Sequence, residues 1–318
     1  MSKLLKLYAS LHSHSTHSDG VYTPAELVRV AKDEGYKAIA LTDHDTVTGN
    51  AEVKAECERV GGIESIFGVE FTTHTDVLDR DFHMTAYHFD SEYPEMKEYL
   101  WQMSERETDQ TRQLFLRGVE IGYIKSITWE EVLEYNKGVS WLCNDHVFRA
   151  MKAKGLITDT EYPEFFETCF GKYRHTIPPK YPFMNAEELI PLVHKAGGII
   201  LIAHPHTQLD CIEYLVSLGL DGIEIWNHGL DGAERREALT LAEKYDLFVG
   251  GGSDHEGILG GEYCHYEHPE QTPIWYPPCT LGTTEFFFEE IRDVKKNPER
   301  KKIFAEMLAD SEIWQRVK

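Results

Sequence analysis

Three histidines and one aspartate fall within eight consecutive positions near the start of the chain, in the segment SLHSHSTHSDG of residues 10–20. His12 and His14 end a short apolar segment that predicts a strand. Because side chains alternate along a strand, these two imidazoles would point to the same side. Neutral imidazoles are good ligands for Zn, Mn or Fe, and Asp19 could reach the same ion from the turn. For His17 we expect a supporting or solvent-exposed position.

Further residues of the metal-ligand type lie at or near the ends of later apolar segments. The predicted strands are residues 4–11, 36–41, 65–71, 81–89, 198–203, 223–227 and 247–254. The candidate ligands on or just after them are His12, His14, His44, Glu70, His83, His204 and Asp254. A random scatter of histidines would not follow strand ends in this way. The pattern therefore favours one metal site, in which the two oxygens of Glu70 are suited to bridging two ions.

The elements between these strands are typical of a barrel. Thr23, Pro24 and Glu26 form a helix start with a capping box, and glycines end several of the predicted helices. Repeated strand–helix units with apolar strands indicate a parallel sheet with helices outside it, and six to eight strands favour closure into a barrel. The carboxyl ends of barrel strands converge on one face, where active sites lie.

Helical patterns dominate residues 92–180, which interrupt the alternation. We predict a barrel formed by residues 1–91 and 181–318, with a helical C-terminal tail, and a helical insertion over residues 92–180 that caps the active-site face. The sequence does not indicate an oligomeric state.

Composition limits the possible partners and compartment. The formal net charge of −22 argues against binding long nucleic acid through a broad basic face. No apolar run reaches about 18 residues, so no membrane span is expected. The six cysteines include no C-x-x-C pair and the N-terminus does not read as a signal peptide, so we predict a cytoplasmic protein with free thiols.

The combined motifs resemble those of the PHP (polymerase and histidinol phosphatase) phosphoesterases. The matching segments, in order, are LHSHSTHSDG, TPAEL, AIALTDHDTVTG, GVE, DFHM, HVFRAMKAKG, AGGIILIAHP, DGIEIWN and GGSD. The resemblance covers nearly the whole chain. It implies an α/β fold, a distorted (β/α)7 TIM-like barrel, with two or three divalent ions (Mn, Zn or Fe) and hydrolysis of phosphate esters by a metal-bridging hydroxide.

The resemblance also implies roles for individual residues. It makes His12, His14, Asp19, His44, Glu70, His83, His204 and Asp254 metal ligands. His146 matches a position that contacts the third metal or the phosphate, and Arg149 matches an arginine common in the family. Asn144 stands where arginine is more usual, which puts that phosphate contact in doubt. The family's last motif usually reads Asp-x-His, and here either Glu256 or His255 would replace the final histidine.

Several other polar residues are candidates for supporting roles. Asp43 and Asp45 flank His44, and one of them would orient an imidazole. Lys172 and Arg174, in the insertion, could reach over the pocket and hold a phosphate. His206 could touch the substrate.

We therefore expect a metal-dependent hydrolase that releases inorganic phosphate from a small phosphate monoester or small cyclic phosphodiester of a sugar or nucleotide. The first alternative is a nucleotide phosphatase or short 5′–3′ exonuclease acting on oligonucleotide ends. Two further alternatives are a metal-dependent amidohydrolase and a non-catalytic metal-binding domain.

Overall fold

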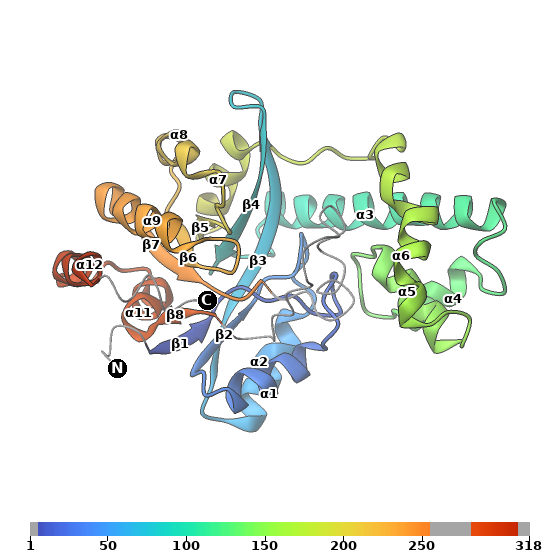
Figure 1. The fold of residues 1–318 in the computed structure, drawn as a ribbon, viewed down its shortest axis with the longest axis horizontal. Helices are drawn as coiled ribbons and strands as arrows, with labels where there is room; N and C mark the ends of the chain where they lie inside the picture. The colour runs from blue at the N-terminus through green and yellow to red at the C-terminus, as the bar shows by residue number, and fades with distance from the viewer. Residues whose placement is uncertain (1–5, 255–280, 311–318) are drawn as a thin grey trace.

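The computed structural model describes residues 6–254 and 281–310, which form an α/β barrel with a helical insertion (Figure 1). One eight-stranded sheet has the order β7-β6-β5-β4-β3-β2-β1-β8. Its strands are β1 (Leu7–Ser10), β2 (Ala38–Leu41), β3 (Glu64–Thr75), β4 (Arg80–Tyr87), β5 (Ile199–Ile202), β6 (Gly222–Trp226), β7 (Phe248–Gly251) and β8 (Thr283–Thr284). The predicted strands are thus confirmed within their described residues, and β8 is an additional strand.

The two edges of the sheet meet, which closes the barrel. The backbone N–H of Leu11 donates to the carbonyl of Gly251 at 3.0 Å, directly after β1 and at the end of β7. Gly252 and Gly282 form an antiparallel bridge beside them. A side chain at position 252 has no room, because a Cβ there would lie 2.3 Å from the backbone nitrogen of His12. The distorted TIM-like barrel expected from the sequence is therefore confirmed.

The expectation of a parallel sheet is wrong for one predicted strand, β4, and the additional strand β8 is also antiparallel to its neighbour. β4 runs antiparallel to both β3 and β5, and β8 runs antiparallel to β1. The physical reason for β4 is its connection: residues 76–79 form a tight turn between β3 and β4, whereas a parallel neighbour needs a longer crossover. The other pairs of neighbouring strands are parallel.

Helices cover the outside of the barrel. Those packed around the sheet are α1 (Pro24–Asp33), α2 (Asn50–Val60), α7 (Ala186–Lys195), α8 (Ile212–Leu218), α9 (Gly232–Tyr245), α11 (Glu285–Asp293) and α12 (Arg300–Ala309). The predicted capping box of α1 is present: Thr23 Oγ1 accepts from the Glu26 backbone N–H, and the Glu26 carboxylate accepts from the Thr23 backbone N–H. Four strands are buried along their whole length: β2, β5, β6 and β7. Their largely apolar sequences fit this environment, because both faces of each strand contact other side chains.

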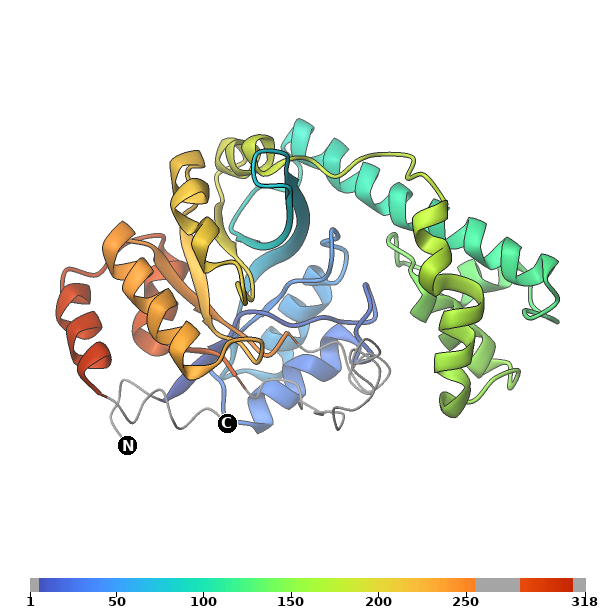
Figure 2. The same cartoon turned by 45° about the horizontal axis from the view of Figure 1, so that its top comes forward.

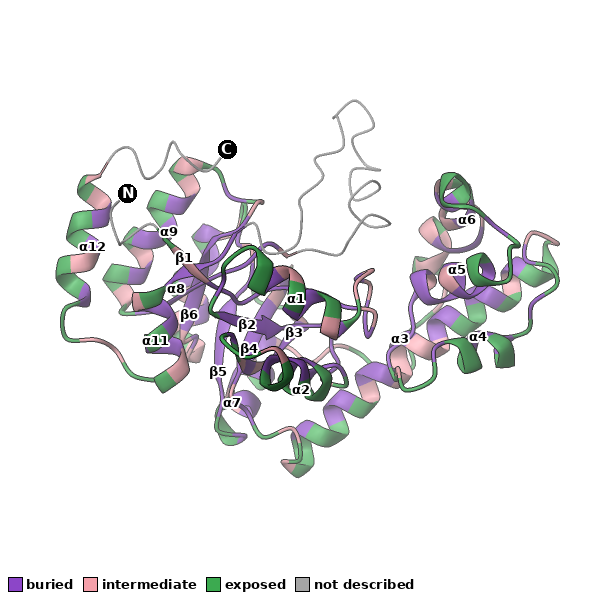
Figure 3. Ribbon diagram, turned by 90° about the horizontal axis from the view of Figure 1, so that it is seen from below, coloured by how far each residue is buried: buried purple, intermediate pink, exposed green. Residues whose placement is uncertain are grey.

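Residues 94–177 project from the barrel as a helical unit (Figures 2 and 3). It comprises α3 (Pro94–Glu120), α4 (Trp129–Tyr135), α5 (Asn144–Ala153), α6 (Tyr162–Phe165) and short helical turns at Asp159–Glu161, Phe166–Phe170 and Gly171–Thr176. The first half of α3 packs on the barrel core through Met96 and Met103, whereas Leu114 and Phe115 belong to a separate apolar cluster within the insertion. This second core lets the insertion hold its own shape beside the barrel mouth. The exact limits of a separate domain remain a prediction.

Within the described residues, no helix combines the length and apolar character that crossing a membrane requires.

Candidate metal centre

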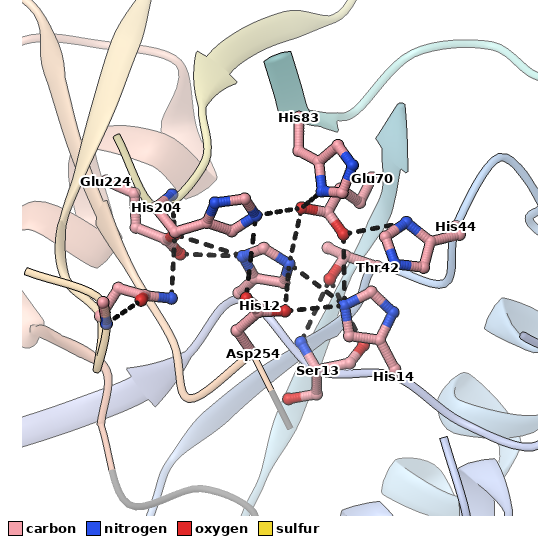
Figure 4. A network of polar contacts seen from close by, with 12 residues as sticks. His12, Ser13, His14, Thr42, His44, Glu70, His83, His204, Glu224 and Asp254 are labelled. Atoms are coloured by element: carbon pink, nitrogen blue, oxygen red, sulfur yellow. Dashed lines mark hydrogen bonds and ion pairs between the residues drawn. The ribbon is translucent and has the colours of Figure 1, made fainter. Parts of the chain in front are cut away.

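The carboxylate of Glu70 lies fully buried among five imidazoles at the mouth of the barrel (Figure 4). The shortest nitrogen–oxygen distances to it are 3.2 Å from His12, 3.2 Å from His14, 3.2 Å from His44, 3.4 Å from His83 and 3.0 Å from His204. Its Oε2 makes no hydrogen bond with any described residue, although imidazole nitrogens surround it. A buried carboxylate oxygen without a hydrogen bond costs free energy unless another positive group compensates it.

Two aspartates complete the cluster. Asp254 Oδ1 lies 3.2 Å from His12 Nε2 and 3.0 Å from His14 Nε2, and these two nitrogens are 3.3 Å apart. Asp19 places its carboxylate oxygens 3.5 Å from His14 Nδ1 and 3.4 Å from His44 Nε2. The donor atoms are therefore directed toward shared points, as in a site built for cations.

Among the residues that the structure describes, three overlapping groups of donor atoms have the spacing of metal sites, with all atoms of a group within 4.8 Å of one another. They are His12, His14, Glu70 and Asp254; His14, Asp19 and His44; and His44, Glu70 and His83. Nitrogen and carboxylate oxygen donors of this kind suit Mn, Zn and Fe. Glu70, His14 and His44 each occur in two groups, so the residues present fit more than one divalent ion.

The barrel strands position these side chains. His12 and His14 follow β1, His44 follows β2, His204 follows β5 and Asp254 follows β7, as the alternating pattern predicts. The backbone turns sharply where the strands end, since His204 and Asp254 have φ values of 27° and 51°. Non-glycine residues with positive φ are uncommon and often occur at functional sites, where the surrounding structure holds them in place.

The electrostatics of the cluster are strongly coupled. Burial alone would raise the pKa of Glu70, but His12, His44 and other imidazoles hold that pKa well below its usual range. Burial likewise lowers the pKa of His44, yet the carboxylates of Asp19 and Glu70 raise it to about 9. The carboxylates that stabilise protons on these imidazoles provide the negative charge that divalent cations would need in their place.

Glu224, on β6, is part of the site and was not predicted. Its side chain is 1% exposed, and its carboxylate accepts from His12 Nδ1 at 3.1 Å and from the backbone N–H of His204 at 2.7 Å. It thereby leaves His12 Nε2 directed at Glu70 and Asp254. The available signal was the segment GIEIW, in which one carboxylate interrupts an otherwise apolar, buried strand.

Asp43 and His17 support the segment that carries the first ligands. Asp43 accepts from the Ser15 backbone N–H at 2.6 Å, from Ser15 Oγ at 2.7 Å and from Ser18 Oγ at 2.7 Å. His17 lies 2.8 Å from Thr48 Oγ1 through Nδ1, and it does not belong to any of the donor groups in the described residues.

Asp45 is buried next to His44 and accepts from the backbone N–H of Thr72 at 3.0 Å. It contacts a strand backbone, and no described hydrogen bond joins it to an imidazole. Burial raises the pKa of Asp45 to about 7, although the neighbouring imidazole of His44 opposes this effect.

The predicted contacts from α5 have backbone partners in this structure. His146 is fully buried, with Nδ1 3.0 Å from the Cys143 backbone nitrogen and Nε2 3.2 Å from the Thr16 carbonyl oxygen. Burial and then Arg149 lower its pKa well below the usual range, so the ring is neutral. Arg149 donates to backbone carbonyls of the segment around Asp19. Contacts of His146 and Arg149 with a metal or phosphate remain predictions.

The two predicted phosphate contacts of the insertion, Arg174 and Lys172, have partners within the insertion. Arg174 forms a two-pronged ion pair with Glu107 and lies close enough to Asp19 for their charges to interact. Lys172 lies 5.4 Å from the ring centre of its neighbour Tyr173. Trp141, which was not predicted, stacks on His44 with ring centres 6.1 Å apart, so the insertion forms one wall of the site.

Four further predicted residues have no demonstrated place in the cluster. Asn144 donates to Asp145 Oδ1 at 2.9 Å. His206 is half-exposed and its Nδ1 lies 2.7 Å from Glu234 Oε1. Glu256 and His255 lie outside the described residues, so the choice between them remains a prediction.

Comparisons with known proteins point to one family. The family model of the PHP domain matches residues 10–180. A 5'-3' exoribonuclease of Haemophilus influenzae is 31% identical over 255 residues, which cover 77% of this chain and 88% of that protein. A phosphoribosyl 1,2-cyclic phosphate 1,2-diphosphodiesterase of Eggerthella lenta is 27% identical over 253 residues, covering 79% and 94%. A solved structure assigned as a metal-dependent phosphoesterase, from Bifidobacterium adolescentis, matches with a TM-score of 0.71 and 25% identity, over 92% of this chain and 98% of that one.

Proposed function

Because the chain belongs to the PHP family and is a metal-dependent phosphoesterase, we propose that it hydrolyses a small phosphorylated metabolite, either a phosphate monoester or a small cyclic phosphodiester of a sugar or nucleotide. The observation that carries the proposal is the buried Glu70 carboxylate among five imidazoles, with one oxygen that makes no hydrogen bond with any described residue. For a monoester, the products are inorganic phosphate and an alcohol.

We assign two or three divalent ions, Mn, Zn or Fe, to the three donor groups around Glu70. Such ions, when bound, supply a water-derived nucleophile near pH 7 and positive charge for the phosphoryl oxygens. The chain's own residues hold the geometry: Glu224 fixes the ring of His12, and Asp43 fixes the segment between His14 and Asp19. Because the metal-ligating side chains are held in place, they can stabilise charge without reorganising during the reaction.

Arg174 is the side chain of the insertion best placed to meet a phosphate. Its guanidinium group is partly exposed, and Glu107 holds it in a two-pronged contact. Guanidinium groups match the geometry of phosphate oxygens. We propose that Arg174 neutralises part of the substrate charge at the open side of the cluster.

A second candidate is hydrolysis at the 5′ end of an oligonucleotide. The relative named a 5'-3' exoribonuclease, at 31% identity, is the observation that favours it. The net charge of −22 disfavours a long nucleic acid but is compatible with a short end held locally by cations.

The test is a substrate panel assayed with Mn added, together with metal analysis of the purified protein. The panel contains a sugar phosphate, a nucleoside monophosphate, a cyclic nucleotide and a 5′-phosphorylated oligoribonucleotide. Glu70→Gln should remove bound metal and lower kcat/KM by more than the ~10–100-fold typical of losing a partner of a metal ligand. Glu64→Gln, at the exposed start of the same strand, is the matched control. Full turnover by a metal-free Glu70→Gln protein would refute the proposal, and cleavage of the oligoribonucleotide alone would select the second candidate.

A further inference from the structure

Asp19 differs from the other donors because no barrel strand positions it. It lies in the turn between β1 and α1, and its side chain is 21% exposed. Its contacts with His14 and His44 therefore depend on the path of the backbone through residues 15–20. On the barrel side, Asp43 holds the backbone N–H of Ser15 and the hydroxyl of Ser18.

The insertion contacts the same turn, residues 15–20, by donating to the carbonyl groups of the turn. Thr16, Ser18 and Gly20 present three alternating carbonyl oxygens, which flank Asp19 along the chain. His146 Nε2 lies 3.2 Å from the Thr16 oxygen. Arg149 donates through Nη2 to the Ser18 oxygen at 3.2 Å and through Nη1 to the Gly20 oxygen at 2.9 Å.

Both donors are themselves held in place on α5. The backbone N–H of Cys143 donates to His146 Nδ1 at 3.0 Å, so Nε2 carries the hydrogen and donates to Thr16. The Nε of Arg149 donates to the carbonyl of Asp145 at 3.2 Å. Between the two donors, Val147 and Phe148 are buried in the insertion's own apolar cluster. The donors are thus rigidly attached to a packed core.

We propose that His146 and Arg149 are positioning residues through which the helical insertion completes the outer metal site, by fixing the turn that carries Asp19. The proposal rests on the metal centre proposed above. It predicts that metal binding at the two groups depends unequally on the insertion. The group of His14, Asp19 and His44 needs the contacts of His146 and Arg149, whereas the group containing Glu70 and Asp254 is positioned by the strands.

Gly20 supports the same conclusion, since the turn is packed too closely to adopt another path. A Cβ at position 20 would lie 2.4 Å from the carbonyl carbon of His14. The Gly20 carbonyl is also an acceptor for Arg149. The turn is therefore packed against the backbone of His14 and is also bound by Arg149 of the insertion.

The experiment measures metal affinity and substrate kinetics in the full-length protein carrying Arg149→Met. We expect one metal equivalent per chain to bind about 10–100-fold more weakly, with the tighter equivalents unchanged. Saturating Mn should restore most of kcat, because Asp19 itself is still present. The control is Lys152→Met on the same helix, whose ammonium group pairs with Asp159, away from the turn. It should bind metal as the unaltered protein does.

Arg149→Lys keeps the positive charge but cannot donate from two guanidinium nitrogens to the Ser18 and Gly20 carbonyl oxygens, so an intermediate weakening of metal binding is expected. It is also the variant to use if Arg149→Met does not fold. Unchanged affinity for every metal equivalent, together with a raised KM for the substrate, would overturn the proposal and make Arg149 a phosphate contact. If the unaltered protein binds only one ion, the assignment of the metal centre fails. This result is distinct from failure of the positioning role proposed for His146 and Arg149.

Discussion

Replacing Glu224 by Gln should weaken metal binding. Glu224 is not one of the proposed metal ligands, but it contacts one of them, His12. The carboxylate accepts from His12 Nδ1, at 3.1 Å to Oε1 and 3.3 Å to Oε2. Its Oε2 also accepts from the His204 backbone N–H at 2.7 Å and from Asn227 Nδ2 at 3.4 Å. A glutamine has the same size but only one acceptor oxygen. If the amide nitrogen takes the Oε2 position, the His204 N–H faces an NH₂ group and loses its acceptor. If it takes the Oε1 position, His12 Nδ1 faces the NH₂ group and keeps only its longer contact, 3.3 Å to Oε2.

The magnitude follows from the loss of one hydrogen bond to a buried charge. Glu224 is 1% exposed, so water cannot readily replace the missing acceptor. Such a bond contributes about 1.5–3 kcal/mol. Because 1.4 kcal/mol corresponds to a tenfold change, the metal group containing His12 should bind its ion about 10–100-fold more weakly.

The assay is a titration of the metal-depleted protein with chelator-buffered Mn, followed by phosphate release at each free metal concentration. For Glu224→Gln the activity curve should shift to higher Mn and approach the unaltered kcat at saturation. Glu213→Gln, whose side chain is 81% exposed on α8, provides a control of the same chemistry. A curve that superposes on that of the unaltered protein would refute the role assigned to Glu224.

Three other perturbations have definite expected outcomes. Arg174→Ala should lower kcat/KM by about 10–100-fold through loss of a charged hydrogen bond, whereas Lys172→Ala should change it little; equal effects would contradict the assignment. Gly252→Ala should cost about 1–3 kcal/mol of unfolding free energy in metal-free protein, because a Cβ would lie 2.3 Å from the His12 nitrogen; unchanged thermal unfolding would count against that packing. Burial lowers the pKa of Lys296 to about 7, so the unfolded chain binds more protons than the folded chain between pH 7 and about 10. Stability should therefore rise with pH in that window by at most ~1.4 kcal/mol per unit, and Lys296→Met should lack this rise when chemical denaturation is followed across it.

The elements that the sequence predicts well are those specified by local patterns. The start of α1 depends on Thr23 and Glu26, three residues apart, and its capping box is present as predicted. The buried strand β5 is apolar throughout and β6 is apolar except for Glu224, and their positions follow from that. The convergence of His12, His44 and the other strand-end residues needs only the barrel topology in addition. Their ligation of metal remains a prediction, although the geometry supports it.

The contacts that could not be predicted join segments far apart in the chain. Glu224 meets His12 across 212 positions, and Arg149 meets Gly20 across 129. The segment GIEIW marks Glu224 as a carboxylate in an apolar strand, but no local pattern identifies the distant partner in either pair. The reversed direction of β4 also escaped prediction, since an apolar segment has the same pattern in a parallel and an antiparallel neighbour.

The reversal of β4 is what brings His83 to the metal cluster. In the antiparallel pair, Thr72 lies opposite His83 and Glu70 lies opposite Thr85, so Glu70 and His83 share one face of the sheet. A parallel β4 would start at the other end of the barrel, and a residue near its start, as His83 is, would lie far from the mouth. A slip of one residue in the pairing would instead turn the imidazole away from Glu70. The tight turn that breaks the regular strand–helix repeat therefore supplies a donor that a uniformly parallel barrel could not obtain from this position.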